Sequence, residues 1–520
     1  MNVHSTQKRL PMFSPATGKQ IGEIEETPLS EVTTFYEKGR SAFQMWSALS
    51  ISNRLHYLRT LKEYMALHME EIAKTISDNT GKVLTEALVA DIMPTLDGIE
   101  HICKHAEKGL KRKTVKTPLL LMGKKSFIEY MPRGVVLVIS PWNYPLQLAM
   151  VPVVSALAAG NTVILKPSEI TPLVGKCMEE LFAAAGLPDG VVQVAHGGKE
   201  VGAAFTEGTP DYIFFTGSVR TGKIIQEVAA KKLIPTTLEL GGKDPMIVFE
   251  DANLKRAAKG AVWAAFTNSG QVCMSAERLY VQKTVYHEFL QLVKKEMETL
   301  KQGIDENADV GSMTFPAQIQ IVREQLVEAL HRGAKLEAGL PPDQWKEGMF
   351  LPITVLSNVQ HNMKVIQEET FGPVLPIIPF EKEDEVISLA NDTVYGLNAS
   401  VWTKDVKKAR HVASKLVSGA VVINDAIVTV ANHGLPFGGA KNSGIGRYHG
   451  AAGLRNFCHE KSIIEDNGRK NTEIQWYPYY GKYPLFLKLF KSYFKPRKDM
   501  IYFAKMYLQL LKKSTEKERK

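Results

Sequence analysis

A single cysteine, Cys273, stands where its thiol could act as a nucleophile. It ends a turn of small residues, Ser269–Val272, between an apolar helical run and a strand-like run. A thiol attacks well only when a neighbouring group lowers its pKa or accepts its proton. The nearest glycine-framed carboxylate upstream is Glu239. An isolated cysteine is more often a small buried hydrophobe, so the assignment of Cys273 depends on the segments that surround it.

Strands and helices alternate regularly between Gly134 and Glu250. Short runs rich in valine and isoleucine alternate there with helical runs. This alternation predicts a parallel, doubly wound sheet with helices on both faces, in which ligands bind beyond the carboxyl ends of the strands. The expected strands are 134–140, 161–166, 191–195, 211–216, 236–240 and 246–249, and the expected helices are 144–159, 172–185 and 220–231.

Polar clusters follow three of these strands. The cluster 216–222 places glycines and Ser218 at the start of a helix, where free N–H groups and the helix dipole favour phosphate. It also reads Gly-x-x-x-x-Gly-Lys, but Ile224 stands where a P-loop needs Ser or Thr for magnesium, which disfavours an NTPase. Lys166 and Glu169, at another strand end, suit sugar hydroxyls, with a surface ion pair as the alternative. We therefore expect a nucleotide site.

Composition excludes several other classes. The four cysteines show no Cys-x-x-Cys spacing, which argues against a disulfide framework or a zinc ribbon. In His101-x-Cys103-x-His105, a helix would turn the cysteine away from both histidines, so a solvated helix is favoured and no metal is expected. The length of 520 residues predicts two or three domains. The first residues lack the pattern of a signal peptide, and we expect a cytoplasmic protein.

The net charge of +9 is concentrated at the C-terminus. Residues 476–520 contain twelve Lys/Arg against three Asp/Glu, an excess of nine, so the rest of the chain is neutral. From 485 to 494 the apolar residues share one helical face with lysines largely off it, and 500–511 repeats the design. Neither run approaches the roughly 20 apolar residues that span a bilayer.

A basic face beside an aromatic face is typical of a helix that lies in a membrane interface. We expect peripheral contact with a membrane surface through residues 476–513. Docking of the tail on the protein body or in a subunit groove is the alternative, and nucleic acid is disfavoured.

Seven segments, in order, resemble the signature segments of the aldehyde dehydrogenase superfamily, across about residues 10–470. The branch that includes fatty aldehyde dehydrogenases is most similar around Trp142–Pro145 and Tyr448–Gly450. The segments are Pro141-Trp142-Asn143-Tyr144-Pro145, Leu165-Lys166-Pro167-Ser168-Glu169, Phe215-Thr216-Gly217-Ser218, Glu239-Leu240-Gly241-Gly242-Lys243, Gly270-Gln271-Val272-Cys273, Glu369-Thr370-Phe371-Gly372-Pro373 and Leu435-Pro436-Phe437-Gly438-Gly439.

The resemblance implies an α/β protein and a homodimeric or homotetrameric assembly. A doubly wound, Rossmann-like NAD-binding domain and a second α/β catalytic domain would be joined to a small bridging or oligomerisation β element. The basic amphipathic helical tail is the main departure from the family's pattern, because the family body should end near Asn467. The expected ranges are 1–113 and 132–245 for the NAD-binding domain, 246–445 for the catalytic domain, 114–131 and 446–470 for the bridging element, and 471–520 for the tail.

The resemblance also implies a mechanism. Cys273 would attack the aldehyde carbon while the Asn143 side-chain amide and the Cys273 backbone N–H hold the oxyanion. After hydride transfer, Glu239 would activate the water that hydrolyses the thioester. Glu169 should repel a 2′-phosphate, which favours NAD, with NADP as the alternative cofactor. The expected cofactor contacts are Ser140, Trp142, Lys166, Ser168, Glu169, Gly217, Ser218, Gly222, Glu369 and Phe371.

The tail favours a lipophilic aldehyde (fatty, aromatic or carotenoid-derived) that reaches the enzyme from a membrane. A small polar substrate, such as a semialdehyde or betaine aldehyde, is the alternative among enzymes. A catalytically silent scaffold of the same fold is the alternative in a different class. The complete set of Asn143, Glu239 and Cys273 disfavours the scaffold.

Overall fold

The computed structural model describes residues 8–515, which form two compact units. The first unit comprises the chain up to Lys111 together with Tyr130–Lys461, and the second comprises Arg112–Glu129 together with the chain from Ser462 onward. The domain ranges expected from the sequence stay a proposal beside this division.

The first unit begins with a hairpin and then builds a six-stranded sheet. Strands β1 (Arg9–Phe13) and β2 (Gln20–Glu25) form the hairpin. In the sheet all neighbouring strands are parallel except β17, which pairs antiparallel with β9 so that Gly444 lies opposite Glu239. Its order is β17 (Gly444–Ile445), β9 (Thr236–Glu239), β8 (Tyr212–Thr216), β5 (Val135–Ile139), β6 (Thr162–Lys166) and β7 (Val192–Val194).

Both faces of this sheet are buried, as the predicted doubly wound fold requires. Val135 and Leu137 of β5 contribute to one core, and Val136 and Val138 contribute to the other. Because side chains alternate between the faces of a strand, a strand covered on both faces is apolar throughout. The faces are covered by α1 (Val32–Ala48), α8 (Lys199–Glu207) and α9 (Val219–Lys231) on one side, and by α6 (Gln147–Ala158) and α7 (Pro172–Ala184) on the other.

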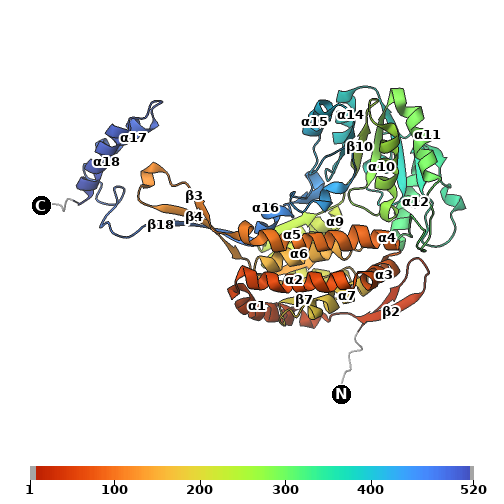
Figure 1. Cartoon of the computed structure of the whole chain (residues 1–520), viewed down its shortest axis with the longest axis horizontal. Coiled ribbons are helices and arrows are strands. Elements are labelled where there is room, and N and C mark those ends of the chain that lie inside the picture. Colours follow the sequence, from red (N-terminus) through yellow and green to blue (C-terminus); the bar gives the residue numbers. More distant parts are fainter. Residues whose placement is uncertain (1–7, 516–520) are drawn as a thin grey trace, which may run out of the picture. The chain divides into compact units, whose positions relative to one another are not determined.

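Further helices lie outside α6 and α7. Helices α2 (Ile51–Leu67) and α5 (Met93–Leu110) pack beside α6 (Figure 1). Between them the chain forms α3 (Met69–Thr80), the short α4 (Leu84–Glu86) and a π-helical turn, η2 (Ala87–Ile92). Such π-helical turns are rare and frequently occur at functional sites.

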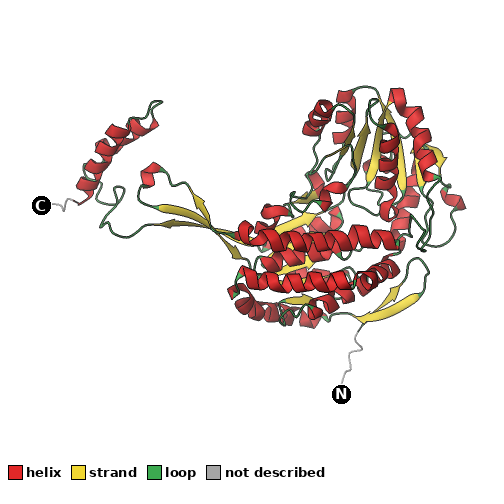
Figure 2. Ribbon diagram, in the orientation of Figure 1, coloured by secondary structure: helices red, strands yellow, loops and turns green. Residues whose placement is uncertain are grey.

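A seven-stranded sheet forms the rest of the first unit. Strand β10, expected to extend the first sheet, instead pairs with β11 and β15 here, because the chain crosses over after Glu239. Helices cover this sheet too (Figure 2), including α10 (Leu254–Phe266), α11 (Tyr286–Met297) and α12 (Pro316–His331). The strand order is β12 (Lys335–Ala338), β13 (Thr354–Ser357), β14 (Val374–Phe380), β11 (Ala276–Gln282), β10 (Asp244–Val248), β15 (Ser400–Trp402) and β16 (Val422–Ile423).

The short helices that accompany this sheet include α13 (Lys364–Gln367), α14 (Glu383–Asn391) and α15 (Val406–Lys415), whereas α16 (Gly450–Asn456) packs against α5 and α6. The fold class predicted from the sequence, two α/β domains with largely parallel sheets, is confirmed.

The second unit contains the tail. Strands β3 (Lys113–Val115), β4 (Lys125–Pro132) and β18 (Cys458–Glu465) form a three-stranded sheet in the order β18, β4, β3. Helices α17 (Tyr483–Phe494) and α18 (Met500–Thr515) pack against each other. Across residues 8–515, no helix is both long and apolar enough to cross a bilayer.

The apolar face expected along residues 485–494 is divided between two environments. Leu489 is fully buried against Phe503 and Leu510 of α18, whereas Phe494 is 70% exposed. Pairing of the two helices therefore buries Leu489 of this face and leaves Phe494 exposed.

Candidate active site

The nucleophile loop is a strained turn between α10 and β11. Asn268 (φ 51°) and Ser269 (φ 56°) both adopt the left-handed conformation, which costs a non-glycine residue roughly 1–2 kcal/mol. The Asn268 N–H donates to a carboxylate oxygen of Glu86 at 2.8 Å, and the Ser269 hydroxyl donates to the Gly311 carbonyl at 2.8 Å. Strain of this kind persists only where the surroundings over-determine it, and it is concentrated at functional sites.

Gln271 holds the same loop from within. Its side chain is fully buried, and its amide N–H donates to the Asn268 carbonyl at 2.9 Å. The Thr314 N–H donates to the side-chain oxygen of Gln271 at 2.8 Å. Cys273 follows immediately and remains partly exposed at the end of this fixed turn.

The thiol of Cys273 is a weak acid in this setting. Burial raises its pKa, and the carboxylates of Asp244, Glu369 and Glu239 add to the rise. The residue is therefore a neutral thiol at neutral pH and needs a base to take its proton.

Asn143 lies directly against the nucleophile loop. It is 3% exposed, and its side-chain Nδ2 donates to the Gln271 carbonyl at 3.0 Å. Its own backbone carbonyl accepts hydrogen bonds from Asn268 Nδ2 at 3.0 Å and from Lys82 Nζ at 2.9 Å. An amide donor is thus held beside the loop that carries the candidate nucleophile.

Glu239 is a buried carboxylate at the end of β9. Within residues 8–515, neither of its carboxylate oxygens receives a hydrogen bond. Burial raises the pKa of Glu239 well above its usual value, and the charge of Arg447 offsets this only in part. A buried, unpaired carboxyl group is costly to fold around, and its perturbed pKa marks it as a candidate functional group.

The glycines that follow Glu239 let three chain segments meet. A Cβ atom at Gly242 would overlap the Cys273 carbonyl oxygen, and one at Gly241 would overlap the Glu369 carboxylate. The Gly242 N–H donates to that carboxylate at 3.0 Å. Absence of side chains here allows the chain after β9 to lie against both the nucleophile loop and Glu369.

A groove of about 370 Å³ follows the start of α9. Ser218, Arg220, Lys364 and Glu369 are among the residues that line it. Ser218 is the N-cap of α9, with its hydroxyl accepting the Thr221 N–H at 3.3 Å, and N–H groups at a helix start suit phosphate. The combination of a helix N-terminus, two cations and a carboxylate fits a dinucleotide.

The sequence analysis missed Arg220 and Lys364. Arg220 belongs to the polar cluster after β8, so its charge beside a phosphate-type loop was an available signal. Lys364 has no local signal, because α13 reaches the groove only through the tertiary fold.

Four of the other predicted cofactor contacts, Ser140, Trp142, Ser168 and Glu169, follow the carboxyl ends of β5 and β6, and Lys166 is the last residue of β6. Lys166 Nζ and Glu169 form an ion pair at 2.8 Å, with Lys166 buried and Glu169 36% exposed. The rings of Trp142 and Phe371 meet edge to face at 5.4 Å between centroids. The Ser140 N–H donates to the Lys166 carbonyl at 3.1 Å.

Three of the predicted contacts also serve local structure. The Ser168 hydroxyl accepts the Ile170 N–H at 3.2 Å within the turn after β6, and the Gly217 N–H donates to the Glu239 carbonyl at 3.0 Å. A Cβ atom at Gly222 would overlap Leu240.

Burial of the Glu369 carboxyl group, and next the negative charge of Glu277, raise the pKa of Glu369 to about 8.

The two histidines of the His101-x-Cys103-x-His105 segment lie on one face of α5, and the cysteine between them does not share that face. The rings of His101 and His105 are 4.5 Å apart, while Cys103 is directed toward the Leu55 carbonyl. In the part of the chain that the structure describes, no group of His, Cys, Asp or Glu is placed to hold a metal ion.

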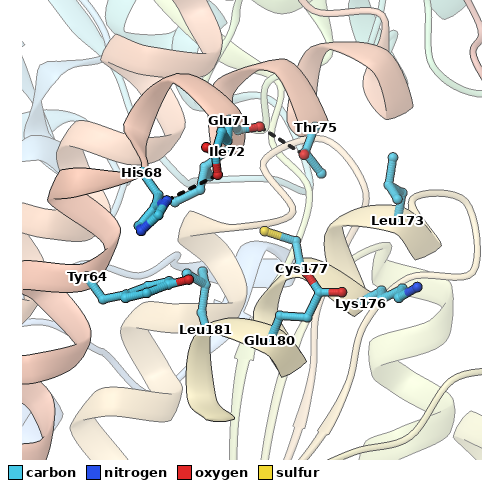
Figure 3. A pocket seen from close by; sticks show the side chains of 10 residues that line it. All are labelled: Tyr64, His68, Glu71, Ile72, Thr75, Leu173, Lys176, Cys177, Glu180 and Leu181. Carbon is cyan, nitrogen blue, oxygen red and sulfur yellow. Dashed lines mark hydrogen bonds and ion pairs between the residues drawn. The ribbon is translucent and has the colours of Figure 1, made fainter. Parts of the chain in front are cut away.

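A second, separate hollow lies between α3 and α7 (Figure 3). It has a volume of about 190 Å³, and Cys177 points into it. Burial raises the pKa of the Cys177 thiol to about 12. It contains none of the predicted site residues.

The fold and this site define a class of enzyme. The sequence model of the aldehyde dehydrogenase family matches residues 2–463, and the chain belongs to that family. It is an aldehyde dehydrogenase that uses a nicotinamide dinucleotide cofactor.

Individual relatives and solved structures are consistent with this family assignment. The chain is 44% identical to 4,4'-diapolycopene aldehyde oxidase of Methylomonas sp over 90% of this chain and 87% of the relative. It is 34% identical to 4-trimethylaminobutyraldehyde dehydrogenase B of Danio rerio, over 89% of each. Among solved structures, the NAD+ complex of aldehyde dehydrogenase from Bacillus cereus is similar, with a TM-score of 0.84 and 33% identity over 88% of this chain and 94% of that one.

Proposed function

We propose that the enzyme oxidises a lipophilic aldehyde to its carboxylic acid through Cys273, Asn143 and Glu239. The observation that carries the assignment of roles is the meeting of three segments. The Asn143 amide lies 3.0 Å from the nucleophile loop, and the glycines after Glu239 lie against the Cys273 carbonyl.

In the first half-reaction a bond forms between the Cys273 sulfur and the aldehyde carbon. Glu239 is the available base for the thiol proton, because both its oxygens are free to accept within residues 8–515. The oxygen that becomes negative is stabilised by Asn143 Nδ2 and the Cys273 N–H, and one such donor is worth roughly 3 kcal/mol. The product of this step is a thiohemiacetal.

NAD, when bound, would supply the acceptor for the hydride of the thiohemiacetal carbon, and loss of that hydride would leave a thioester on Cys273. The residues that would hold the cofactor are Ser218 and Arg220 at its phosphates and Glu369 at the nicotinamide ribose. Glu239 first releases to solvent the proton that it took from Cys273. It then takes a proton from water, the water oxygen bonds to the acyl carbon, and the carbon–sulfur bond breaks. The departing sulfur takes the proton from Glu239, which restores the Cys273 thiol, and the acid is released.

The direct test is Cys273→Ala. We expect the variant to lose aldehyde-dependent NADH formation entirely, because no other group can form the thioester, while NAD still quenches tryptophan fluorescence as in the wild type. Residual NADH formation above background in a correctly folded variant would refute the assignment of Cys273.

The substrate class is proposed from two observations. The 44% identical relative is named for a carotenoid-derived aldehyde, whereas the relative named for a small quaternary ammonium aldehyde is 34% identical. The second unit exposes aromatic residues beside cations, as a surface near lipid would. A panel of aldehydes of increasing chain length tests this, and a higher kcat/KM for betaine aldehyde than for decanal would favour the polar alternative.

NAD rather than NADP is the proposed cofactor. Glu169 stands at the end of β6 with 36% of its side chain exposed, where its charge would meet a 2′-phosphate. Lys166 forms an ion pair with Glu169 and weakens that repulsion. We therefore propose a preference for NAD that is moderate rather than absolute.

A cytoplasmic enzyme that contacts a membrane surface through its tail is the proposed setting. Tyr480, Tyr483 and Ile501 are 81%, 76% and 87% exposed, far more than such side chains usually are. Lys488 and Lys491 are exposed on the same helix as Tyr483, and Lys495 is exposed immediately after that helix ends. Aromatic rings with nearby lysines match the headgroup region of an anionic bilayer.

Vesicle flotation tests the membrane proposal with the full chain. We expect flotation with phosphatidylserine-containing vesicles, and little with phosphatidylcholine alone, because about 1 kcal/mol is gained per Lys near an anionic surface. Lys488→Glu/Lys491→Glu/Lys495→Glu should abolish flotation without loss of activity on a soluble aldehyde. Equal flotation of this variant would remove the electrostatic argument.

We also propose a homodimer or homotetramer. The three-stranded sheet of the second unit ends in the short, exposed strand β3, and an exposed strand edge can pair with another chain. Mass photometry gives the state directly, and a purely monomeric distribution at micromolar concentration would contradict this part of the proposal.

A further inference from the structure

Three ionisable side chains beside the candidate active site have no role in the mechanism proposed for it. Lys82, Glu86 and Asp91 lie within ten residues of one another, just before α4, at its end and in the π-helical turn η2. The side chains of Lys82 and Asp91 are 0% exposed. Burying charge without water is costly, so such groups persist only where each is paired and hydrogen-bonded.

Lys82 contacts the chain on both sides of the Asn143–Tyr144 peptide. Its Nζ donates to the Asn143 carbonyl at 2.9 Å and to a carboxylate oxygen of Asp91 at 3.2 Å. The same ammonium lies 3.8 Å from the centre of the Tyr144 ring, a cation–π contact. These contacts hold the backbone of Asn143 in place.

Asp91 extends this support to the next helix. Its second carboxylate oxygen accepts the Gln147 N–H, at the start of α6, at 2.7 Å. The π-helical turn Ala87–Ile92 contains Asp91. One ion pair thus spans the segment from Asn143 to the first turn of α6.

Glu86 contacts the opposite partner, the nucleophile loop. One of its carboxylate oxygens accepts the Thr267 hydroxyl at 2.7 Å and the Asn268 N–H at 2.8 Å. Asn268 is one of the two residues in the left-handed conformation, and its side chain also donates to the Asn143 carbonyl at 3.0 Å. The segment 82–91 therefore contacts both the Asn143 backbone and the strained turn.

We propose that Lys82, Glu86 and Asp91 are positioning residues that together form a charged brace. The brace sets the Asn143 amide and the Cys273 loop at the separation that the reaction needs. The proposed function of the brace rests on the proposed role of Asn143. A displacement of about 1 Å at a reacting centre can cost roughly 100-fold in rate, which is the effect that the brace prevents.

The test uses the full-length enzyme and two reactions. One is aldehyde oxidation, and the other is hydrolysis of p-nitrophenyl acetate, in which the Cys273 sulfur bonds to the acyl carbon and p-nitrophenolate leaves without any cofactor. The variant Lys82→Met/Asp91→Leu replaces the ion pair by apolar groups of similar volume, which generally preserves folding. We expect kcat/KM to fall about 100-fold in both reactions, while the Kd for NAD is unchanged.

A double-mutant cycle separates positioning from general loss of structure. If the ion pair acts through Asn143, adding Lys82→Met/Asp91→Leu to Asn143→Ala should cost less than about threefold further. Multiplicative losses, or activity of Lys82→Met/Asp91→Leu close to wild type, would overturn the brace. Wild-type activity of Asn143→Ala alone would instead refute the proposed role of Asn143.

Substitution of Glu86 provides a second test, because glutamine keeps the shape of the glutamate side chain. Glu86→Gln retains an acceptor oxygen for Thr267 and Asn268 and should keep activity within about threefold, whereas Glu86→Ala should lose at least about tenfold. Equal activity of the two would contradict the inference. Arg54→Met is the matched control, because Arg54 is a buried cation that donates to the carbonyls of Leu49 and Ala158, away from the site. It should lower the melting temperature and leave kcat/KM unchanged.

Discussion

The two proton-carrying groups of the site are both held in their neutral forms. Burial raises the pKa of the Cys273 thiol and of the Glu239 carboxyl group. The negative charge of the Glu239 carboxylate also adds to the rise of the thiol pKa. In the free enzyme at neutral pH, Cys273 is therefore a thiol and not a thiolate. The reaction should become faster as pH rises, because a larger fraction of Glu239 can then accept a proton.

Glu239→Gln tests both consequences. The variant should form the thioester poorly and hydrolyse it 10²–10⁴-fold more slowly, the usual contribution of a general base. It should also change stability with pH. A carboxyl group whose folded pKa is raised stabilises the fold below its unfolded pKa of about 4.3, and that contribution is lost as pH rises through the folded pKa.

The melting temperature provides the measurement. Glutamine removes the cost of charging residue 239, so the variant should gain stability over the wild type, and the gain should be larger at pH 9 than at pH 6. A gain that is equal at both pH values would show that the Glu239 pKa is not raised.

At the scale of elements, the site depends on how closely the chain after β9 approaches its neighbours. The backbone at Gly241 and Gly242 lies between the Cys273 carbonyl and the Glu369 carboxylate. Packed interiors respond to a single added methyl group, because neighbouring backbone cannot move aside without moving the elements that carry it. The pair of glycines therefore joins the base, the nucleophile and the cofactor groove in one arrangement.

Gly242→Ala tests this approach. We expect kcat/KM to fall by about 100-fold with a loss of roughly 1–3 kcal/mol in stability, because the new Cβ must displace the Cys273 carbonyl. Gly198→Ala is the control, since its Cβ would meet only a Glu26 oxygen at 4.0 Å. Normal kinetics in Gly242→Ala would mean that the nucleophile loop can shift without consequence.

At the scale of the whole molecule, the two units have separate apolar cores. The core of the second unit is built from Leu489, Phe503, Met506 and Leu510, with Leu119 and Leu120 packed against it. The candidate active site lies entirely within the first unit. The chemistry and the tail should therefore be separable by mutation.

Leu489→Asp should separate them. Asp at a fully buried position costs several kcal/mol, enough to open the pairing of α17 and α18. Hydrogen exchange should speed up across 483–511, while kcat/KM for a short, soluble aldehyde stays within about twofold of the wild type. Phe494→Asp, at an exposed position of the same helix, should leave exchange slow. Loss of activity in Leu489→Asp would show that the units are coupled.

The sequence by itself determined the fold class, the family and the cofactor type. Alternating apolar runs predict the doubly wound sheet because both faces of each strand are buried, as Val135–Val138 illustrate. The position of Ser218 at the start of a helix was predictable because an N-cap is a local feature of the chain. These properties depend on neighbours in sequence, and short-range patterns record them.

Only the tertiary structure decided how the site is built. The left-handed turn at Asn268 and Ser269, the support by Lys82 and Glu86, and the place of Lys364 in the groove all arise from residues far apart in the chain. The tail illustrates the same point, because pairing of its two helices buries Leu489 and leaves Phe494 exposed. The spacing of apolar residues in the sequence indicates which face of a helix is apolar. The residues that cover that face are far away in the sequence and reach it only when the chain folds.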